Sequence, residues 1–143
     1  MAGNEVLISS LSKRFVSLER GLLAAASFFI RALRKDKVGL EIFLVSEKDM
    51  FVMNREYRGK NFPTNVLAFE EPKNFPSRKK GIKTLGEIYL APTYIKEHGE
   101  DIEYMLLHGI LHLIGFNHEN KSDRISMEKI EGALMKKWLS NKS

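Results

Sequence analysis

The stretch that organises the sequence, residues 102–118, reads IEYMLLHGILHLIGFNH. Almost every residue up to Phe116 is apolar and none is a proline, which predicts a helix that is buried on most of its circumference. Gly115 follows the last periodic residue, where a glycine accepts the left-handed conformation that ends a helix. We therefore expect the fold to be organised around one buried helix.

Three of the four histidines fall in this stretch, at His108, His112 and His118. Two helical residues four positions apart lie one turn apart and within roughly 40° of each other, so both imidazoles can reach one ion at about 2.0–2.1 Å. The chain reversal at Gly115 lets His118 return as a third ligand. Three nitrogen ligands leave one tetrahedral position open, which is typical of a catalytic Zn²⁺ site rather than a structural one. Core histidines are the alternative, but three buried imidazoles without a common partner would cost roughly 1–3 kcal/mol for each unsatisfied group.

Gly109 bears on the class of reaction. The histidine spacing is similar to the H-E-x-x-H pattern of zinc proteases, in which a glutamate acts as general base, but Gly109 stands where that glutamate would be. Peptide hydrolysis by that mechanism is therefore disfavoured. A small zinc hydrolase of another substrate class stays open as an alternative.

The bulk composition places further bounds on the function. The 143 residues are expected to form a single domain, residues 1–143, and the absence of cysteine excludes thiolate ligands and fits a reducing cytoplasm. No apolar run approaches the ~20 residues that a membrane span requires, so we predict a cytoplasmic protein with no membrane partner. The 23 Lys and Arg against 18 Asp and Glu give a net charge of +5, which favours polyanions such as nucleic acid without requiring them.

Hydrophobic periodicity predicts strands at residues 5–8, 38–45, 65–69 and 85–90. It predicts helices at residues 17–34 and 46–58, a short helix from Pro92 and a last helix that begins at Ser122 or Asp123. Ser17 and Ser46 are the expected N-caps of the first two helices, and Gly59 is expected to end the second. This order of elements predicts an α+β fold with one small mixed sheet and helices packed on it.

The connection at residues 70–84 is rich in proline, glycine and basic residues, which predicts a mobile loop between two strands. Such a loop could attract phosphate, although a run of charge is often only solvated. Its basic residues are Lys73, Arg78, Lys79, Lys80 and Lys83.

Three blocks together resemble one known family. They are HGILHLIGFNH at residues 108–118, NREYRGK followed by PTNVLAF within residues 54–69, and LGEI at residues 85–88. In this order they are similar to the YbeY family, bacterial metal-dependent endoribonucleases of ribosomal RNA maturation, over residues 38–138. The resemblance implies a sheet of about four strands with the metal-bearing helix central, and a single-strand-specific endoribonuclease that takes part in ribosomal RNA maturation and ribosome quality control. It also implies one zinc ion and the ribosome or small-subunit proteins as partners.

The resemblance places a functionally important arginine at Arg58. A guanidinium stays charged and can bind two phosphate oxygens through parallel hydrogen bonds, so Arg58 is the expected catalytic residue that stabilises charge. Lys60 would assist as a point charge. Lesser roles in orienting the substrate are expected for Thr64, Asn65 and Glu87.

The sequence departs from the family pattern at Asn117, where relatives usually carry aspartate before the third histidine. Asparagine can orient a histidine or a water, as a supporting residue of the metal site, but it cannot accept a proton as a base. The proton acceptor therefore stays open among Glu119, Glu87 and the 2′-hydroxyl of the RNA. A second alternative is a binding module in which the metal only staples the fold. The native metal is also open, because imidazole suits nickel, copper and iron as well as zinc.

Overall fold

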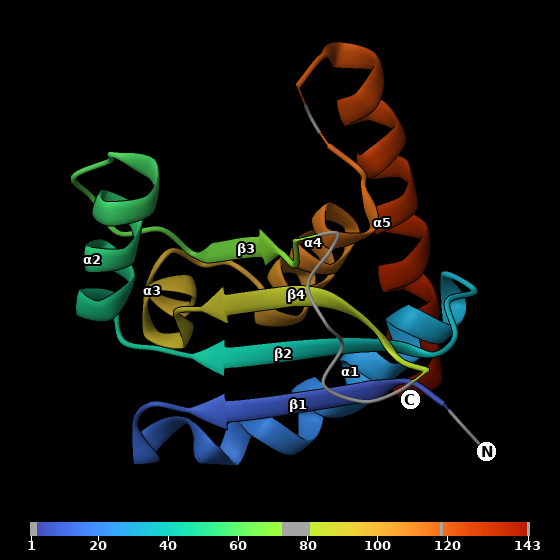
Figure 1. Cartoon of the computed structure of the whole chain (residues 1–143), viewed down its shortest axis with the longest axis horizontal. Helices are drawn as coiled ribbons and strands as arrows, with labels where there is room; N and C mark the ends of the chain where they lie inside the picture. The colour runs from blue at the N-terminus through green and yellow to red at the C-terminus, as the bar shows by residue number, and fades with distance from the viewer. Residues whose placement is uncertain (1–2, 73–80, 118, 143) are drawn as a thin grey trace.

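Four strands form one mixed sheet in the computed structural model, which describes residues 3–72, 81–117 and 119–142 (Figure 1). The strands are β1 (Glu5–Ser10), β2 (Val38–Leu44), β3 (Val66–Glu70) and β4 (Lys83–Leu90). They lie in the order β1–β2–β4–β3; β2 pairs in parallel with β1 and β4, and β3 runs antiparallel to β4. The predicted four-stranded mixed sheet is confirmed.

The helices complete a single α+β domain. Figure 1 shows α1 and α4 behind the strands and α5 along the right-hand side of the molecule. The described helices include none with the length and hydrophobicity that a bilayer span requires. The helical elements are the 3₁₀ helix η1 (Lys13–Leu18) and the α-helices α1 (Glu19–Ala32), α2 (Glu47–Arg58), α3 (Pro92–Glu97), α4 (Ile102–Ile114) and α5 (Lys121–Lys142).

The two faces of the sheet carry different sets of side chains, because successive residues of a strand point to opposite faces. Ile42 and Ile88 are fully buried in the main core together with residues of α1 and α4. On the other face, Phe43 and Tyr89 stack with ring centroids 4.8 Å apart and pack against a smaller cluster that includes Met50 of α2. The sheet therefore separates a large helical layer from a smaller layer formed by α2.

Local capping signals explain where the central helices begin and end. The Asp49 N–H donates to the Ser46 side-chain oxygen at 3.1 Å, as predicted for the N-cap of α2. Gly59 ends α2 in the left-handed conformation with φ 68°, and Gly115 ends α4 with φ 116°. Both glycines stand where the sequence pattern predicts them.

Two predicted N-caps are wrong. Ser17 lies inside η1, and no side-chain hydrogen bond caps α1, because the chain enters α1 directly from this 3₁₀ turn. The last helix begins at Lys121, ahead of the predicted Ser122 or Asp123. Asn120 takes the capping role instead, since its side-chain oxygen accepts the Asp123 N–H at 2.8 Å.

Candidate active site

Helix α4 is held at both ends by local hydrogen bonds. At its start, the Asp101 carboxylate accepts the Glu103 N–H at 2.9 Å. At its end, the Phe116 N–H donates to the Leu111 carbonyl at 3.0 Å. The Gly115 N–H donates to the His112 carbonyl at 3.1 Å. This pair of bonds is the Schellman arrangement that a left-handed glycine allows. The chain therefore leaves α4 in a defined direction.

The histidine pair lies on one face of α4. His108 and His112 are one turn apart, and their ring centroids are separated by 5.0 Å. The adjacent Gly109 faces the sheet, where it packs against Ile88 of β4. The apolar face of α4 is thus buried against the core, while the histidine face borders a cavity.

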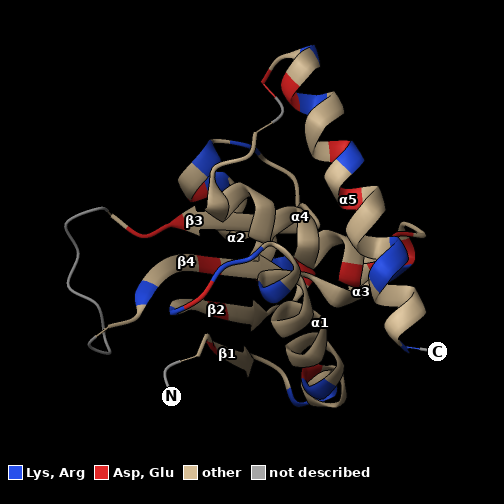
Figure 2. Cartoon of the chain, turned by 90° about the vertical axis from the view of Figure 1, so that its right-hand side faces the viewer, with Lys and Arg blue, Asp and Glu red and all other residues tan. Residues whose placement is uncertain are grey.

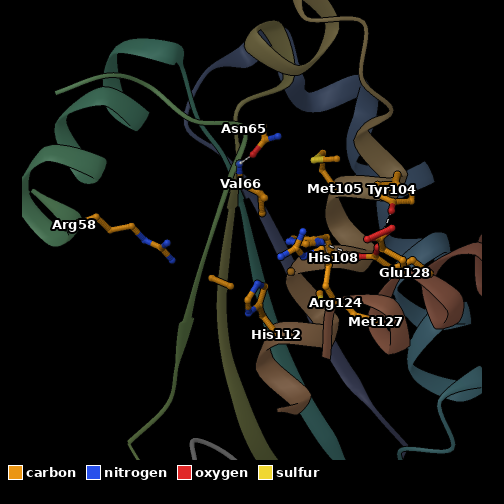
Figure 3. Close-up of a pocket in the computed structure, with 13 residues that line it drawn as sticks. Arg58, Asn65, Val66, Tyr104, Met105, His108, His112, Arg124, Met127 and Glu128 are labelled. Carbon is orange, nitrogen blue, oxygen red and sulfur yellow. Dashed lines mark hydrogen bonds and ion pairs between the residues drawn. The ribbon is translucent and has the colours of Figure 1, made fainter. Parts of the chain in front are cut away.

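This cavity has a volume of about 440 Å³ and lies between α4, the C-terminal end of α2, the start of β3 and the first half of α5. Figure 3 shows Arg58 extending from α2 toward the histidines on the opposite wall. The polar residues that line it are Arg58, Asn65, Tyr104, His108, His112, Arg124, Glu128 and Glu131. The structure thus brings the predicted arginine and two of the predicted histidines into one site.

Arg58 owes its position to the end of α2. Gly59 stops the helix directly after it, and the buried Asn54 side chain fixes the loop that follows by donating to the Phe62 carbonyl at 2.8 Å. None of the described carboxylates forms an ion pair with Arg58. Figure 2 shows basic residues at this end of α2 and both signs of charge along α5. The Arg58 guanidinium is therefore available for an anionic ligand.

A second hollow, of about 500 Å³, continues from Arg58 and His112 past the end of α4. Asn117 and Glu119 line it, and the Asn117 side-chain oxygen accepts the Glu119 N–H at 3.3 Å. His118, the predicted third ligand, lies outside the described residues. Its two neighbours in the chain thus border the same site as His112.

Sequence reasoning missed Glu131, a residue of α5 that is only 2% exposed. Its carboxylate meets His108 Nδ1 at 2.7 Å and accepts the Tyr104 hydroxyl at 2.6 Å. A signal was present, because Glu131 occupies a position on the apolar stripe formed by Met127, Leu134 and Trp138. A lone carboxylate on a buried stripe indicates a buried partner, since buried charges are paired.

The contacts of Glu131 shift two pKa values. Burial by itself raises the pKa of the Glu131 carboxyl, but hydrogen bonds from His108 and Tyr104 outweigh it and hold this pKa below its ordinary value. Burial first, and then the bond to Glu131, raises the pKa of Tyr104 to about 12. The tyrosine is therefore a hydrogen-bond donor, and the glutamate an acceptor, at neutral pH.

The lesser predicted residues are only partly gathered at the site. Asn65 lines the cavity, and its side-chain amide donates to Glu100 at 3.1 Å. Thr64 donates to the Asn65 side chain at 3.4 Å without lining the cavity. Lys60 is exposed, with its ammonium 5.9 Å from the centroid of the Phe62 ring. None of the three contacts the histidine pair through a described hydrogen bond.

Glu87 does not belong to the site. It alternates with the buried Ile88 along β4 and so points to the face of the sheet opposite α4. There it accepts the Tyr89 hydroxyl at 3.0 Å and lines a different hollow with Glu41. Because Glu87 points away from α4, this placement corrects the expectation that it orients the substrate or accepts a proton at the histidines.

The histidines present fit two of the three predicted ligands of a Zn²⁺ ion. His108 presents Nδ1 to a carboxylate, which accepts but cannot donate, so the neutral ring carries its lone pair on Nε2 as a metal ligand requires. Within residues 3–72, 81–117 and 119–142, no group of three His, Cys, Asp or Glu side chains could hold a metal ion. The described part of the chain thus supplies part of a ligand set and no complete one.

The predicted phosphate-attracting loop lies mostly outside the described residues. Its basic residues Lys73, Arg78, Lys79 and Lys80 are among those that the structure leaves undescribed. Lys83 is exposed at the start of β4. The role of this loop stays a prediction.

The chain is similar to known proteins over most of its length. The family model described as endoribonuclease YbeY matches residues 10–139. The endoribonuclease YbeY of Stenotrophomonas maltophilia is 35% identical over 80% of this chain and 80% of the relative, and that of Bdellovibrio bacteriovorus is 34% identical over 90% of this chain and 91% of the relative. The solution structure of TM1509 from Thermotoga maritima superposes with a TM-score of 0.51 at 27% identity, covering 96% of this chain and 93% of that one. The chain therefore belongs to the endoribonuclease YbeY family.

Proposed function

We propose that this chain is a metal-dependent endoribonuclease that cleaves single-stranded ribosomal RNA. The relatives named above are endoribonucleases. The observation that carries the proposal is the cavity in which the histidine pair of α4 faces Arg58 across a space of about 440 Å³. This arrangement combines nitrogen ligands for a cation with a fixed positive charge for a phosphate.

The ligands of the cation would be His108, His112 and His118. Zinc suits three nitrogen ligands with an open fourth position and is the metal that we propose. When bound, the ion would supply Lewis acidity toward a phosphoryl oxygen and a water of lowered pKa. The remaining steps fall to side chains that the structure describes.

Arg58 would hold the scissile phosphate. Its guanidinium can donate two parallel hydrogen bonds to phosphate oxygens, and such charge-assisted bonds strengthen as negative charge develops. Arg124 lines the same cavity from α5 and adds a second positive charge. Lys60 lies in the exposed loop after α2, where it would attract more distant phosphates as a point charge.

The proton acceptor must be a group other than Asn117, whose amide is not a base. Glu119 is the predicted carboxylate that borders the hollow beside His112. We assign proton transfer to Glu119 or to the 2′-hydroxyl of the RNA, since Glu87 lies on the opposite face of the sheet. Gly109, which faces Ile88, offers no carboxylate of the protease type.

The preference for a single-stranded substrate comes from the family resemblance, and the cavity beside the histidines is where such a strand would bind. The His108 side chain is 28% exposed and lines the cavity, so the scissile phosphate would enter between α2 and α4. Unpaired RNA can bend its backbone into such a space, whereas a duplex is rigid. The resemblance further suggests action on ribosomal RNA in the cytoplasm, with the ribosome or small-subunit proteins as partners and a part in ribosome quality control.

A time course of single-stranded RNA cleavage by zinc-loaded protein tests the proposal. His112→Ala should lose cleavage, and Arg58→Ala should lower its rate by about 10²–10³. His98→Ala is the matched control, because His98 is exposed at the end of α3, where its ring bonds to the Tyr94 carbonyl at 2.8 Å, away from the cavity. Equal cleavage by wild type and His112→Ala would refute the metal site. RNA binding without cleavage by the wild type would favour the binding module instead.

A further inference from the structure

Glu131 is the buried charged residue of α5 that the catalytic scheme leaves unused. It is 2% exposed and the only charged residue among the buried side chains of the described chain. A buried carboxylate is costly unless it is hydrogen-bonded. Both of its oxygens are engaged, one by Tyr104 and the other by His108.

One oxygen of the Glu131 carboxylate is held by Tyr104, and the other contacts His108, a candidate metal ligand. Tyr104 lies one turn before His108 on α4, and its hydroxyl donates to Glu131 Oε1 at 2.6 Å. His108 Nδ1 lies 2.7 Å from Glu131 Oε2. Since α5 contributes the acceptor and α4 both donors, the ring orientation of His108 depends on how these helices pack.

We propose that Glu131 is a positioning residue that holds the hydrogen of His108 on Nδ1 and directs Nε2 into the cavity toward the cation. This role rests on the proposed metal-dependent function. A ligating histidine whose other nitrogen donates to a carboxylate has a fixed tautomer and a more basic ligand nitrogen, and loss of such a partner typically lowers metal affinity about 10- to 100-fold. Tyr104 contributes by fixing the far oxygen of the carboxylate.

Glu128 offers a matched control for this role. It lies on α5 three residues before Glu131 and lines the same cavity, but no described hydrogen bond joins it to a histidine. Glu128→Gln and Glu131→Gln each remove one negative charge from the cavity. Glu128→Gln therefore reports the loss of a carboxylate that lines the cavity without contacting His108, whereas Glu131→Gln also changes the contact with His108.

The test measures the zinc affinity of the full chain by competition with a chromophoric chelator, for wild type, Glu131→Ala, Glu131→Gln and Glu128→Gln. Glu131→Ala should raise the dissociation constant about 10- to 100-fold. Glu131→Gln should raise it less, because one amide oxygen still accepts from His108. Glu128→Gln should stay within about threefold of wild type, as expected for an exposed charge.

A second readout needs neither zinc nor activity. Proton–nitrogen NMR correlations of the histidine rings, recorded on metal-free protein at a pH where His108 is neutral, report which nitrogen carries the hydrogen. Wild type should carry it on Nδ1, and Glu131→Ala should lose that preference. Circular dichroism establishes that each variant is folded, and Glu131→Gln, which keeps the side-chain volume, preserves the test if the alanine variant unfolds.

The outcomes separate this role from the function on which it rests. A wild type that takes up no zinc would overturn both the metal-dependent function and the role of Glu131. A wild type that takes up zinc with an affinity unchanged by either substitution at Glu131 would overturn the positioning role alone. A wild-type His108 with its hydrogen on Nε2 would also overturn it.

Discussion

The contact between α4 and the sheet makes a quantitative prediction at Gly109. A Cβ atom at this position would lie 3.1 Å from both Cδ1 and Cγ2 of Ile88 and 3.3 Å from its Cγ1. Carbon atoms in favourable contact are about 3.5–4.0 Å apart, so all three distances are too short by a few tenths of an ångström. Ile88 is 0% exposed and packs inside the main core, where a shift would displace other core side chains. Gly109→Ala should therefore overpack the interface between α4 and β4.

Two opposing effects decide the size of the change. Overpacking of a filled core costs about 1–3 kcal/mol. Replacing glycine by alanine inside a helix stabilises the folded state by about 1 kcal/mol, because alanine has the higher helix propensity. We expect Gly109→Ala to lower the free energy of unfolding by about 1 kcal/mol, within a range of roughly 0–2.

Gly132 of α5 supplies the matched control. A Cβ atom there would meet no other atom within 4 Å, and the residue is exposed. Gly132→Ala should therefore stabilise the protein by about 1 kcal/mol through helix propensity alone. The propensity gain cancels between the two variants, so their difference of about 1–3 kcal/mol measures the overpacking.

Urea unfolding of metal-free protein in the presence of a chelator gives these free energies without a contribution from ligand binding. The double variant of Gly109→Ala with Ile88→Val, which removes Cδ1, should recover at least about 0.5 kcal/mol relative to the sum of the single changes. Equal stabilisation by Gly109→Ala and Gly132→Ala would refute the packing of α4 on β4 described here.

Three further predictions concern the framework of the site. Gly86→Ala should lower the free energy of unfolding by about 3 kcal/mol or more in urea, because φ is 147° and a Cβ atom would collide with a carbonyl oxygen of β3; a loss below about 1 kcal/mol would contradict this backbone geometry. Asn54→Ala should cost about 1–2 kcal/mol and slow RNA cleavage, because the hydrogen bond to Phe62 that holds the loop after α2 is lost; an unchanged cleavage rate would show that the loop does not need this bond. Burial, followed by the hydrogen bond to Glu87, raises the pKa of Tyr89 from 10.0 to about 12, so its phenol should stabilise the fold below about pH 10 and lose that contribution between about pH 10 and 12. An alkaline absorbance titration should then show a lower pKa for Tyr89 in Glu87→Gln, and an identical titration curve would contradict the contact.

Local sequence signals were sufficient for the central helix and its ends. The apolar run of α4, the left-handed glycines Gly59 and Gly115 and the cap at Ser46 each depend on residues within one or two turns. The same local information places His108 and His112 on one face of a helix. These features could be predicted because no distant contact is needed to decide them.

Features that depend on distant packing could not be predicted in this way. Glu87 was assigned to the site because it belongs to the LGEI block, but only the packing of α4 against Ile88 shows which face of the sheet carries this helix. Glu131 is 23 residues from His108, and the crossing of α5 over α4 brings them together. The charged residue on an otherwise apolar stripe was the available signal, and it identifies a buried partner without naming it.

Metal removal and restoration test the central claim most directly. Protein stripped by a chelator, dialysed and then reloaded with one equivalent of zinc should lose single-stranded RNA cleavage and regain it, while circular dichroism shows that the fold is kept in the stripped state. Full cleavage by the stripped protein would contradict a metal-dependent endoribonuclease built on the histidines of α4. Unfolding on metal removal would indicate that the ion acts as a structural staple.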